Sequence, residues 1–264
     1  MNIFSKKYNV TLEQIENVLR QKTWWAGVAI LPVARRLILL ICNYTNIKPN
    51  TITLFSLFLR IVSAVCFLKG DKLFFVFGAI IFELAYVFDC VDGAVARLKK
   101  QSSPIGMFLD HVTDAAGIII NIIALSWSQN IFFSINVFLV ITIYLYINFM
   151  TFVAETLFFK YEICLDQKNG QSSLNIKKNG KFVIWDWIVK SISKYRKMFF
   201  QKNYKAFFSL PDFEAFLCFF CPLFGIVKKG FNISVYVLLM IFLYKIFSYI
   251  YVITVHSQKT HQNF

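Results

Sequence analysis

Six apolar stretches constrain the fold of this chain more than any other feature. They cover residues 52–68, 73–97, 106–127, 131–159, 213–227 and 233–255. A helix needs roughly 17 or more residues to cross the hydrocarbon core, and only the stretch at 213–227 is marginal. The composition agrees, because 58% of the residues are hydrophobic and 16% are charged, whereas about a quarter are charged in a soluble domain. The sequence therefore predicts an all-α integral membrane protein with six transmembrane helices.

The segment before the first apolar stretch has two parts. Residues 1–22 are predicted to form an N-terminal cytoplasmic helix, because Thr11-x-x-Gln14 fits a capping box. Residues 23–48 are predicted to form an amphipathic helix at the membrane interface. Arg35 and Arg36 lie near its centre, and two arginines inside a span would cost about 5–7 kcal/mol on the insertion scale. The alternative is a first transmembrane helix at residues 26–44.

The distribution of basic residues predicts the orientation. With six spans, both termini lie on one side, together with residues 97–100 and the strongly basic connection at 160–205. The positive-inside rule places that side in the cytoplasm, which implies the inner membrane if the source is bacterial. The net charge of +14 fits contact with anionic membrane phospholipids, and we expect no nucleic-acid partner. We interpret 160–205 as a solvated basic face; a segment lying on the membrane or over the active site is the alternative.

A cluster of charged and small residues lies where the second apolar stretch ends and the third begins. It reads D-C-V-D-G-A-V-A-R, then eight residues, then G-M-F-L-D-H-V-T-D. On helices, the charged and small positions of each half share one face. The Ser102-Ser103-Pro104 segment between the halves predicts a chain reversal. The positions in question are Asp89, Asp92, Gly93, Ala96, Arg97, Gly106, Asp110 and Asp114.

This arrangement would bring four carboxylates together at the ends of two antiparallel helices. Their mutual repulsion is strong, and removing them from water adds several kcal/mol per ion. Arg97 offsets one of the four charges. Two divalent cations would offset the rest, and carboxylate oxygens are the ligands that Mg²⁺ or Mn²⁺ prefers. The alternative is a set of acidic residues that are merely solvated at helix ends.

The eight positions resemble the signature of the CDP-alcohol phosphotransferases, which are also called CDP-alcohol phosphatidyltransferases. All eight are present at the family's spacing. The resemblance is tight over 89–114, looser over 32–117 and thin beyond. It implies a membrane enzyme that transfers a substituted phosphate from a CDP-alcohol to the hydroxyl of an acceptor alcohol, releasing CMP, in phospholipid biosynthesis. It also implies two Mg²⁺ or Mn²⁺ ions, a catalytic domain over 49–258 and a homodimer.

The resemblance also implies roles for individual residues. The metal ligands would be Asp89, Asp92, Asp110 and Asp114, and Asp114 would also accept the proton of the acceptor hydroxyl. The small residues Gly93, Ala96 and Gly106 would leave space beside the helices, and Arg97 would hold phosphate. Pro49-Asn50-x2-Thr53 resembles a family pattern near the nucleotide, although ordinary helix-start residues explain it equally well. The implied substrate-binding residues are Asn50, Thr53, Asp92, Gly93, Ala96, Arg97 and Gly106.

Several alternatives stay open at this point. CDP-diacylglycerol is the favoured donor; a soluble CDP-alcohol that donates to a lipid or polyol acceptor is the alternative. A non-enzymatic cation site in a transporter or scaffold is a remote one. A prenyltransferase would place two Asp-rich motifs far apart, whereas here all four aspartates lie close in sequence. Other polar residues of the apolar stretches and their borders are candidates for the acceptor pocket: Glu83, Asn148, Thr151, Glu155, Glu214 and Lys245.

Overall fold

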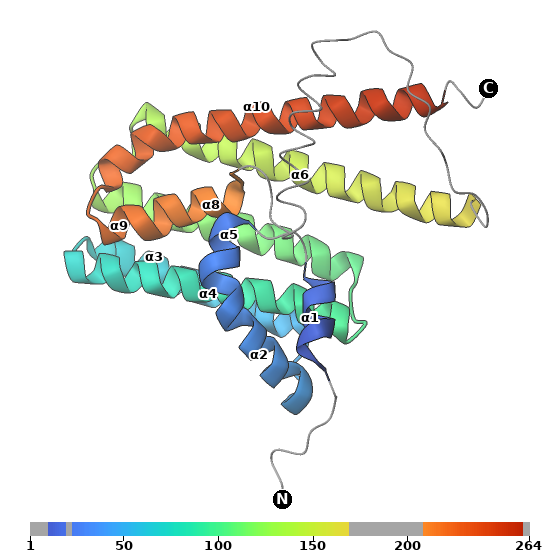
Figure 1. Ribbon diagram of the computed structural model, residues 1–264. Helices are drawn as coiled ribbons and strands as arrows, with labels where there is room; N and C mark the ends of the chain where they lie inside the picture. Colours follow the sequence, from blue (N-terminus) through green and yellow to red (C-terminus); the bar gives the residue numbers. More distant parts are fainter. Residues whose placement is uncertain (1–9, 20–22, 169–207, 261–264) are drawn as a thin grey trace, which may run out of the picture.

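A computed structural model describes residues 10–19, 23–168 and 208–260, and all regular structure within them is helical (Figure 1). This confirms the predicted all-α class. The elements are α1 (Leu12–Val18), the π-helical η1 (Ala26–Ile30), α2 (Leu31–Tyr44), α3 (Pro49–Lys69), α4 (Lys72–Leu98), α5 (Pro104–Ser128), α6 (Ile135–Lys168), α8 (Leu210–Ala215), the π-helical η2 (Phe216–Phe220), α9 (Cys221–Leu223) and α10 (Val227–Thr260).

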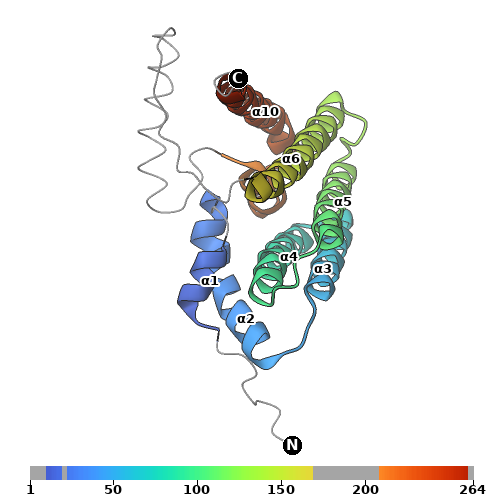
Figure 2. The same ribbon diagram turned by 90° about the vertical axis from the view of Figure 1, so that its right-hand side faces the viewer.

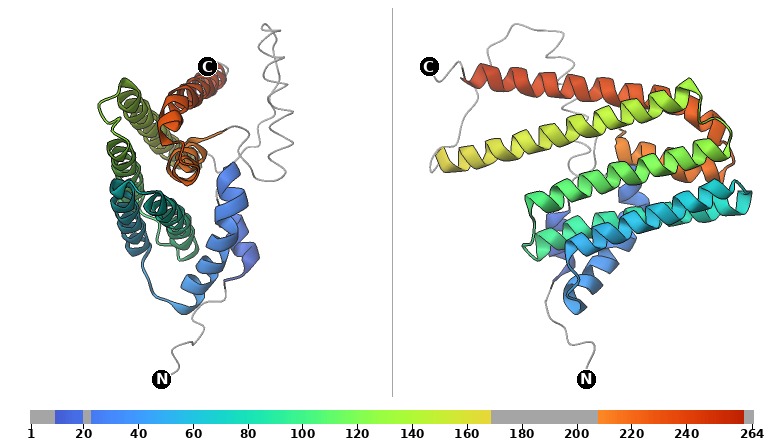
Figure 3. Two further views of the ribbon diagram at one scale, coloured as in Figure 1. Left: turned by 90° about the vertical axis from the view of Figure 1, so that its left-hand side faces the viewer. Right: turned by 180° about the vertical axis from the view of Figure 1, so that it is seen from behind.

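Six described segments are long and apolar enough to cross a membrane, so the chain is an integral membrane protein. Five of them, in α3, α4, α5, α6 and α10, coincide with predicted apolar stretches and run lengthwise along one another (Figures 1 and 3). The six are Ala26–Tyr44, Pro49–Lys69, Lys72–Leu98, Pro104–Ser128, Ile135–Ala154 and Val227–Phe247.

The stretch predicted at 213–227 has different bounds from those expected. Its helical part runs from Leu210 to Leu223 and includes the π-helical η2. The chain then turns at Gly225, whose φ of 68° is in the left-handed region that favours glycine. At about 1.5 Å per residue this helix reaches only about 20 Å. Its crossing of the bilayer therefore stays a prediction.

The segment Ala26–Tyr44 is long and apolar enough to cross a membrane, yet its direction differs from that of the five long helices. In Figure 1, α2 runs across them near the ends of α4 and α5 that carry the motif. Arg35 forms an ion pair with Glu16, with Nε 2.5 Å from Oε1. The interfacial helix that the two arginines predict stays a prediction. The capping box at the start of α1 is present, because Thr11 and Gln14 exchange both hydrogen bonds.

The turn between α4 and α5 brings the two halves of the motif together. At the end of α4, Lys100 has a φ of 53°, and the amide of Gln101 donates to the carbonyl of Ala96 over 2.8 Å. This pattern is a helix-ending Schellman motif. The next helix begins with an N-cap, because the Ser103 hydroxyl accepts a hydrogen bond from the amide of Gly106 over 3.0 Å. The predicted chain reversal is therefore confirmed.

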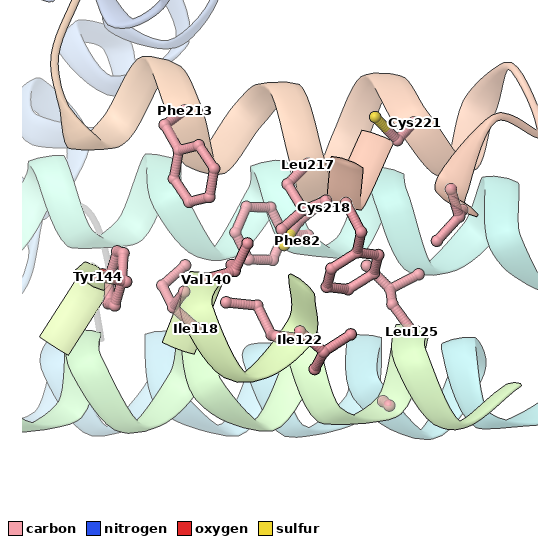
Figure 4. Close-up of a cluster of buried hydrophobic side chains, with 14 of the residues drawn as sticks. Phe82, Ile118, Ile122, Leu125, Val140, Tyr144, Phe213, Leu217, Cys218 and Cys221 are labelled. Atoms are coloured by element: carbon pink, nitrogen blue, oxygen red, sulfur yellow. The ribbon is translucent and has the colours of Figure 1, made fainter. Parts of the chain in front are cut away.

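Apolar packing joins the long helices into one bundle. Figure 4 shows its centre, where side chains of α4, α5, α6, α8 and η2 meet. The α3 and α4 helices approach closely at Gly78, where an added Cβ would lie 2.6 Å from Cε1 of Phe67. The labelled core residues include Phe82, Ile118, Ile122, Tyr144, Phe213 and Leu217.

A second apolar cluster attaches the N-terminal helices to the bundle. Ile15 of α1 and Ile38 of α2 are fully buried with Val91 and Val95 of α4. Figure 2 shows α4 between these N-terminal helices and α5. Val91 and Val95 lie between the motif residues along α4, so this packing holds one face of α4, and α4 also packs against α3.

Candidate active site

Three of the four motif aspartates gather between α4 and α5. Carboxylate oxygens of Asp89, Asp92 and Asp110 all lie within 4.8 Å of one another. Asp92 is only 3% exposed, and the other two are half-buried. An ion about 2.1 Å from each of two oxygens holds them at most about 4.2 Å apart. Small rotations of the carboxylates would therefore allow a hard divalent cation, and the all-oxygen ligand set suits Mg²⁺ or Mn²⁺.

The fourth aspartate has a different partner. Asp114 forms an ion pair with Arg60 of α3, with Nη1 2.8 Å from Oδ1. The same nitrogen donates to the main-chain carbonyl of Asp114 over 3.1 Å. The other nitrogen, Nη2, lies 3.4 Å from Oδ1 of Asp89. Asp114 thus stands beside the three-carboxylate group, and Arg60 connects the two.

Sequence reasoning did not assign Arg60 to the site. Arg60 is 2% exposed although it lies near the middle of a predicted span. The signal was present in the sequence, because Thr53, Ser56, Arg60 and Ser63 follow one another at intervals of three and four residues. This spacing puts them on one face of a helix, and all four are buried. A polar stripe on an apolar helix indicates a face turned toward other polar groups.

Thr53 contacts the carboxylate group, whereas its role in substrate binding remains a prediction. Its hydroxyl donates to Oδ2 of Asp92 over 2.5 Å and is itself buried. The α3 helix begins at Pro49, whose fixed φ suits the first helical position. Thr53 therefore fixes the orientation of one carboxylate, in the way that outer-shell partners orient metal ligands.

Asn50 and Gly106 lie next to each other at the open end of the motif. A Cβ added to Gly106 would be 3.4 Å from Oδ1 of Asn50 and 3.1 Å from Oγ of Ser103. An open groove of about 210 Å³ begins here. A side chain at residue 106 would therefore crowd Ser103 and Asn50, two of the residues that line the groove. The groove is lined by Lys48, Pro49, Asn50, Gln101 and Ser103.

Arg97 contacts the N-terminal helix. Its Nε donates to the carbonyl of Val18 over 2.8 Å, at the end of α1. A Cβ added to Gly93 would lie 3.2 Å from Nη1 of Arg97, so Gly93 leaves room for the guanidinium. Ala96 is half-buried, and its carbonyl accepts the hydrogen bond from the Gln101 amide that ends α4. The predicted phosphate-binding role of Arg97 remains a prediction.

Several acceptor candidates have protein partners instead. The Tyr144 hydroxyl donates to Oε1 of Glu214 over 2.8 Å. The indole of Trp25 donates to Oε2 of Glu83 over 2.8 Å. One carboxylate oxygen of each glutamate is therefore paired within the protein, while Oε1 of Glu83 is buried without a hydrogen-bond partner in the described part of the chain. Of the remaining candidates, Lys245 donates a hydrogen bond to Thr151, and Asn148 is half-buried. The side chain of Glu155 lies outside the described residues. Most of the basic connection at 160–205 also lies outside them.

The fold and the carboxylate group define a helical membrane protein with three clustered aspartates. A family model described as CDP-alcohol phosphatidyltransferase matches residues 46–183, just over half of the chain. The chain therefore belongs to the CDP-alcohol phosphatidyltransferase family. It is a membrane phosphotransferase of phospholipid biosynthesis, as the motif predicted.

The structure is similar to a crystal structure of phosphatidylinositol phosphate synthase from Mycobacterium tuberculosis with CDP-DAG bound. The TM-score is 0.46 and the identity is 15%, and the similarity covers 80% of this chain and 90% of that chain. No significant relative is found among curated protein sequences.

Proposed function

We propose that this enzyme transfers the phosphatidyl group of CDP-diacylglycerol to the hydroxyl of an acceptor alcohol and releases CMP. The observation that carries this proposal is the carboxylate group of Asp89, Asp92 and Asp110, which lies beside the Arg60–Asp114 pair. A diphosphate donor brings negative charge to this group, so the reaction needs cations held there. The apolar helices that carry the motif support a site next to the bilayer, where a lipid donor resides.

The four aspartates are proposed to hold two Mg²⁺ or Mn²⁺ ions. When bound, the ions would neutralise the diphosphate and favour departure of CMP as Lewis acids. Asp89, Asp92 and Asp110 supply oxygens from two helices, and Thr53 orients Asp92.

Asp114 is proposed to accept the proton of the acceptor hydroxyl. The acceptor oxygen then forms a bond to the phosphorus that carries the diacylglycerol. The bond from this phosphorus to the oxygen of CMP breaks, and CMP leaves with the electron pair. The proton lost by the acceptor resides on Asp114, and Arg60 holds that carboxylate in place through its 2.8 Å ion pair.

The donor is proposed to lie along the α3–α4–α5 face of the motif. Asn50 lines the groove at the open end of the motif, and Gly106 keeps this end free of side chain. Lys48 of the same groove supplies positive charge for an anionic nucleotide. The substrate-binding set proposed here is the one that the sequence indicated: Asn50, Thr53, Asp92, Gly93, Ala96, Arg97 and Gly106.

The same proposal includes an orientation and an assembly. The motif and both termini are proposed to face the cytoplasm, supported by the excess of basic residues at 97–100 and 160–205. A homodimer is proposed from the family resemblance. Reporter fusions at the C-terminus test the orientation. We expect activity from a reporter that works only in the cytoplasm. Activity from a reporter that works only outside the cytoplasm would contradict the proposal.

CMP release by the purified protein tests the function. We expect CMP from CDP-diacylglycerol with at least one of a panel of alcohols in the presence of Mg²⁺ or Mn²⁺, and none with EDTA. The control variant is Asp71→Asn, which changes an exposed aspartate at the opposite end of α4. No CMP from any CDP-alcohol would contradict the proposal. CMP from soluble donors alone would assign the donor to the soluble class.

A further inference from the structure

Arg60 is the buried charge at the centre of the site. It is 2% exposed and lies within a helix that is long and apolar enough to cross the membrane. An ionised side chain at such a depth is costly unless it has ionised partners. Its partners come from two other helices, Asp89 of α4 and Asp114 of α5. One guanidinium therefore ties the three helices of the site together.

The contacts use the planar shape of the guanidinium. Nη1 reaches both the carboxylate and the main-chain carbonyl of Asp114, at 2.8 and 3.1 Å, while Nη2 reaches Asp89 at 3.4 Å. A lysine ammonium is a point charge and does not present donors in two fixed directions. The geometry is thus specific to arginine, and it fixes the position of the Asp114 backbone as well as its carboxylate.

The protein also leaves a shaped space for this side chain. A Cβ added to Gly117 of α5 would lie 2.3 Å from Cδ of Arg60, so the arginine passes over a glycine. Asn121, one turn further along α5, donates to the carbonyl of Arg60 over 3.0 Å. The same amide donates to the carbonyl of Gly117 over 2.8 Å. Arg60 is therefore held along its length and at its tip.

We propose that Arg60 is a positioning residue of the transfer reaction. Through its contacts with Asp114 and Asp89, it holds Asp114 beside the group formed by Asp89, Asp92 and Asp110, so that Asp114 is placed to accept a proton. Its permanent positive charge also limits how strongly the site attracts divalent cations. This inference rests on the proposed function for the proton-accepting step, whereas the effect on cation binding is independent of turnover.

Arg60→Met separates this role from a purely structural one. The variant keeps the apolar length of the side chain and removes the charge. We expect kcat to fall about 100-fold, the loss typical of a misplaced reacting group, with the KM for CDP-diacylglycerol within about 3-fold. Mn²⁺ binding, measured by calorimetry without substrate, should become about 10-fold tighter because a repelling charge is gone. A structural role predicts weaker Mn²⁺ binding instead.

Arg60→Lys provides a second variant in case the first does not fold. It keeps the charge but loses the paired contacts of the guanidinium with Asp114 and Asp89. We therefore expect Mn²⁺ affinity within about 3-fold of the original and kcat about 10-fold lower. Arg36→Met is the matched control, because Arg36 is exposed on α2. Size-exclusion chromatography and thermal unfolding in detergent establish that each variant is folded.

The outcomes separate the two proposals. Folded Arg60→Met with kcat within about 3-fold of the original overturns the positioning role. Equal or weaker Mn²⁺ binding in that variant overturns the charge role. An original protein that releases no CMP from any CDP-alcohol refutes the proposed function and with it the positioning role, while the Mn²⁺ titration still decides the charge role.

Discussion

The two halves of the α3–α4–α5 bundle meet in different ways. In the half farther from the motif, Gly78 of α4 makes room for the ring of Phe67, and the Ser63 hydroxyl donates to the carbonyl of Gly78 over 2.8 Å. In the motif half, Gly117 of α5 makes room for Arg60, which pairs with Asp114. Each half uses a glycine for close approach, but one admits an apolar ring and the other a charge.

This difference separates the source of stability from the source of activity. Apolar packing lowers the free energy of the folded state whether or not substrate is bound. The motif half instead buries charges that gain little for folding, because desolvation offsets their attraction. We therefore expect changes in the packed half to alter the free energy of unfolding. Changes in the motif half should alter turnover of protein that remains folded.

The largest expected effect is the loss of the motif carboxylates. Asp110→Asn or Asp114→Asn should lower CMP release by about 10³-fold or more, because an amide neither accepts the proton nor holds the cations. Both variants should remain folded, since asparagine is nearly the same size as aspartate. Turnover is measured as CMP released at saturating Mg²⁺. Retained release in one variant would refute the role of that residue.

A matched pair of glycine substitutions compares the halves directly. Gly117→Ala places a methyl group where Cδ of Arg60 lies 2.3 Å away, so Arg60 must shift and CMP release per folded molecule should fall about 100-fold. Gly78→Ala crowds the Phe67 ring at 2.6 Å and should cost about 1–3 kcal/mol of stability.

The measurements for this pair are kcat on the monodisperse fraction and thermal unfolding in detergent. Both measurements are made on each variant. The comparison fails if Gly78→Ala lowers kcat per folded molecule as much as Gly117→Ala does. It also fails if Gly117→Ala changes only the unfolding temperature.

Much of the architecture follows from the sequence because hydrocarbon demands long apolar helices. Five helices were predictable for this reason, and the turn between the two halves of the motif was predictable from the Ser102-Ser103-Pro104 segment. The segment Leu210–Leu223 was less so, because its π-helical turn and its stop at Gly225 depend on packing against other elements. The length of an apolar stretch gives no information on such contacts.

Prediction of the site was partial for a similar reason. The spacing of the motif predicted that all four aspartates meet, because they lie on two consecutive helices joined by a short turn. Three of them, Asp89, Asp92 and Asp110, form the carboxylate group. It did not show that Asp114 pairs with Arg60, since that contact joins helices far apart in sequence. The polar stripe predicts which face of α3 is buried. The residues that Arg60 contacts depend on how three helices pack.

Thr53 allows a milder test of the motif half. Thr53→Ala removes the hydroxyl that donates to Asp92, and loss of such an outer partner costs about 10-fold or more in metal affinity or activity. The Mg²⁺ concentration that gives half-maximal CMP release should therefore rise. Thr53→Ser keeps the hydroxyl and should restore most of the affinity. Equal behaviour of the two variants would show that the hydroxyl does not orient Asp92.

The smallest effect is expected from the corresponding change in the packed half. Ser63 lies on the same buried face of α3 as Thr53, but its hydroxyl donates to the carbonyl of Gly78. Hydrogen bonds between membrane helices contribute about 0.6 kcal/mol on average, so Ser63→Ala should lower the unfolding temperature only slightly. Its Mg²⁺ dependence should equal that of the original protein, because no metal-site residue loses a partner. If Ser63→Ala instead shifts the Mg²⁺ requirement as Thr53→Ala does, the two halves are coupled through α3, and stability and activity do not separate along the helix.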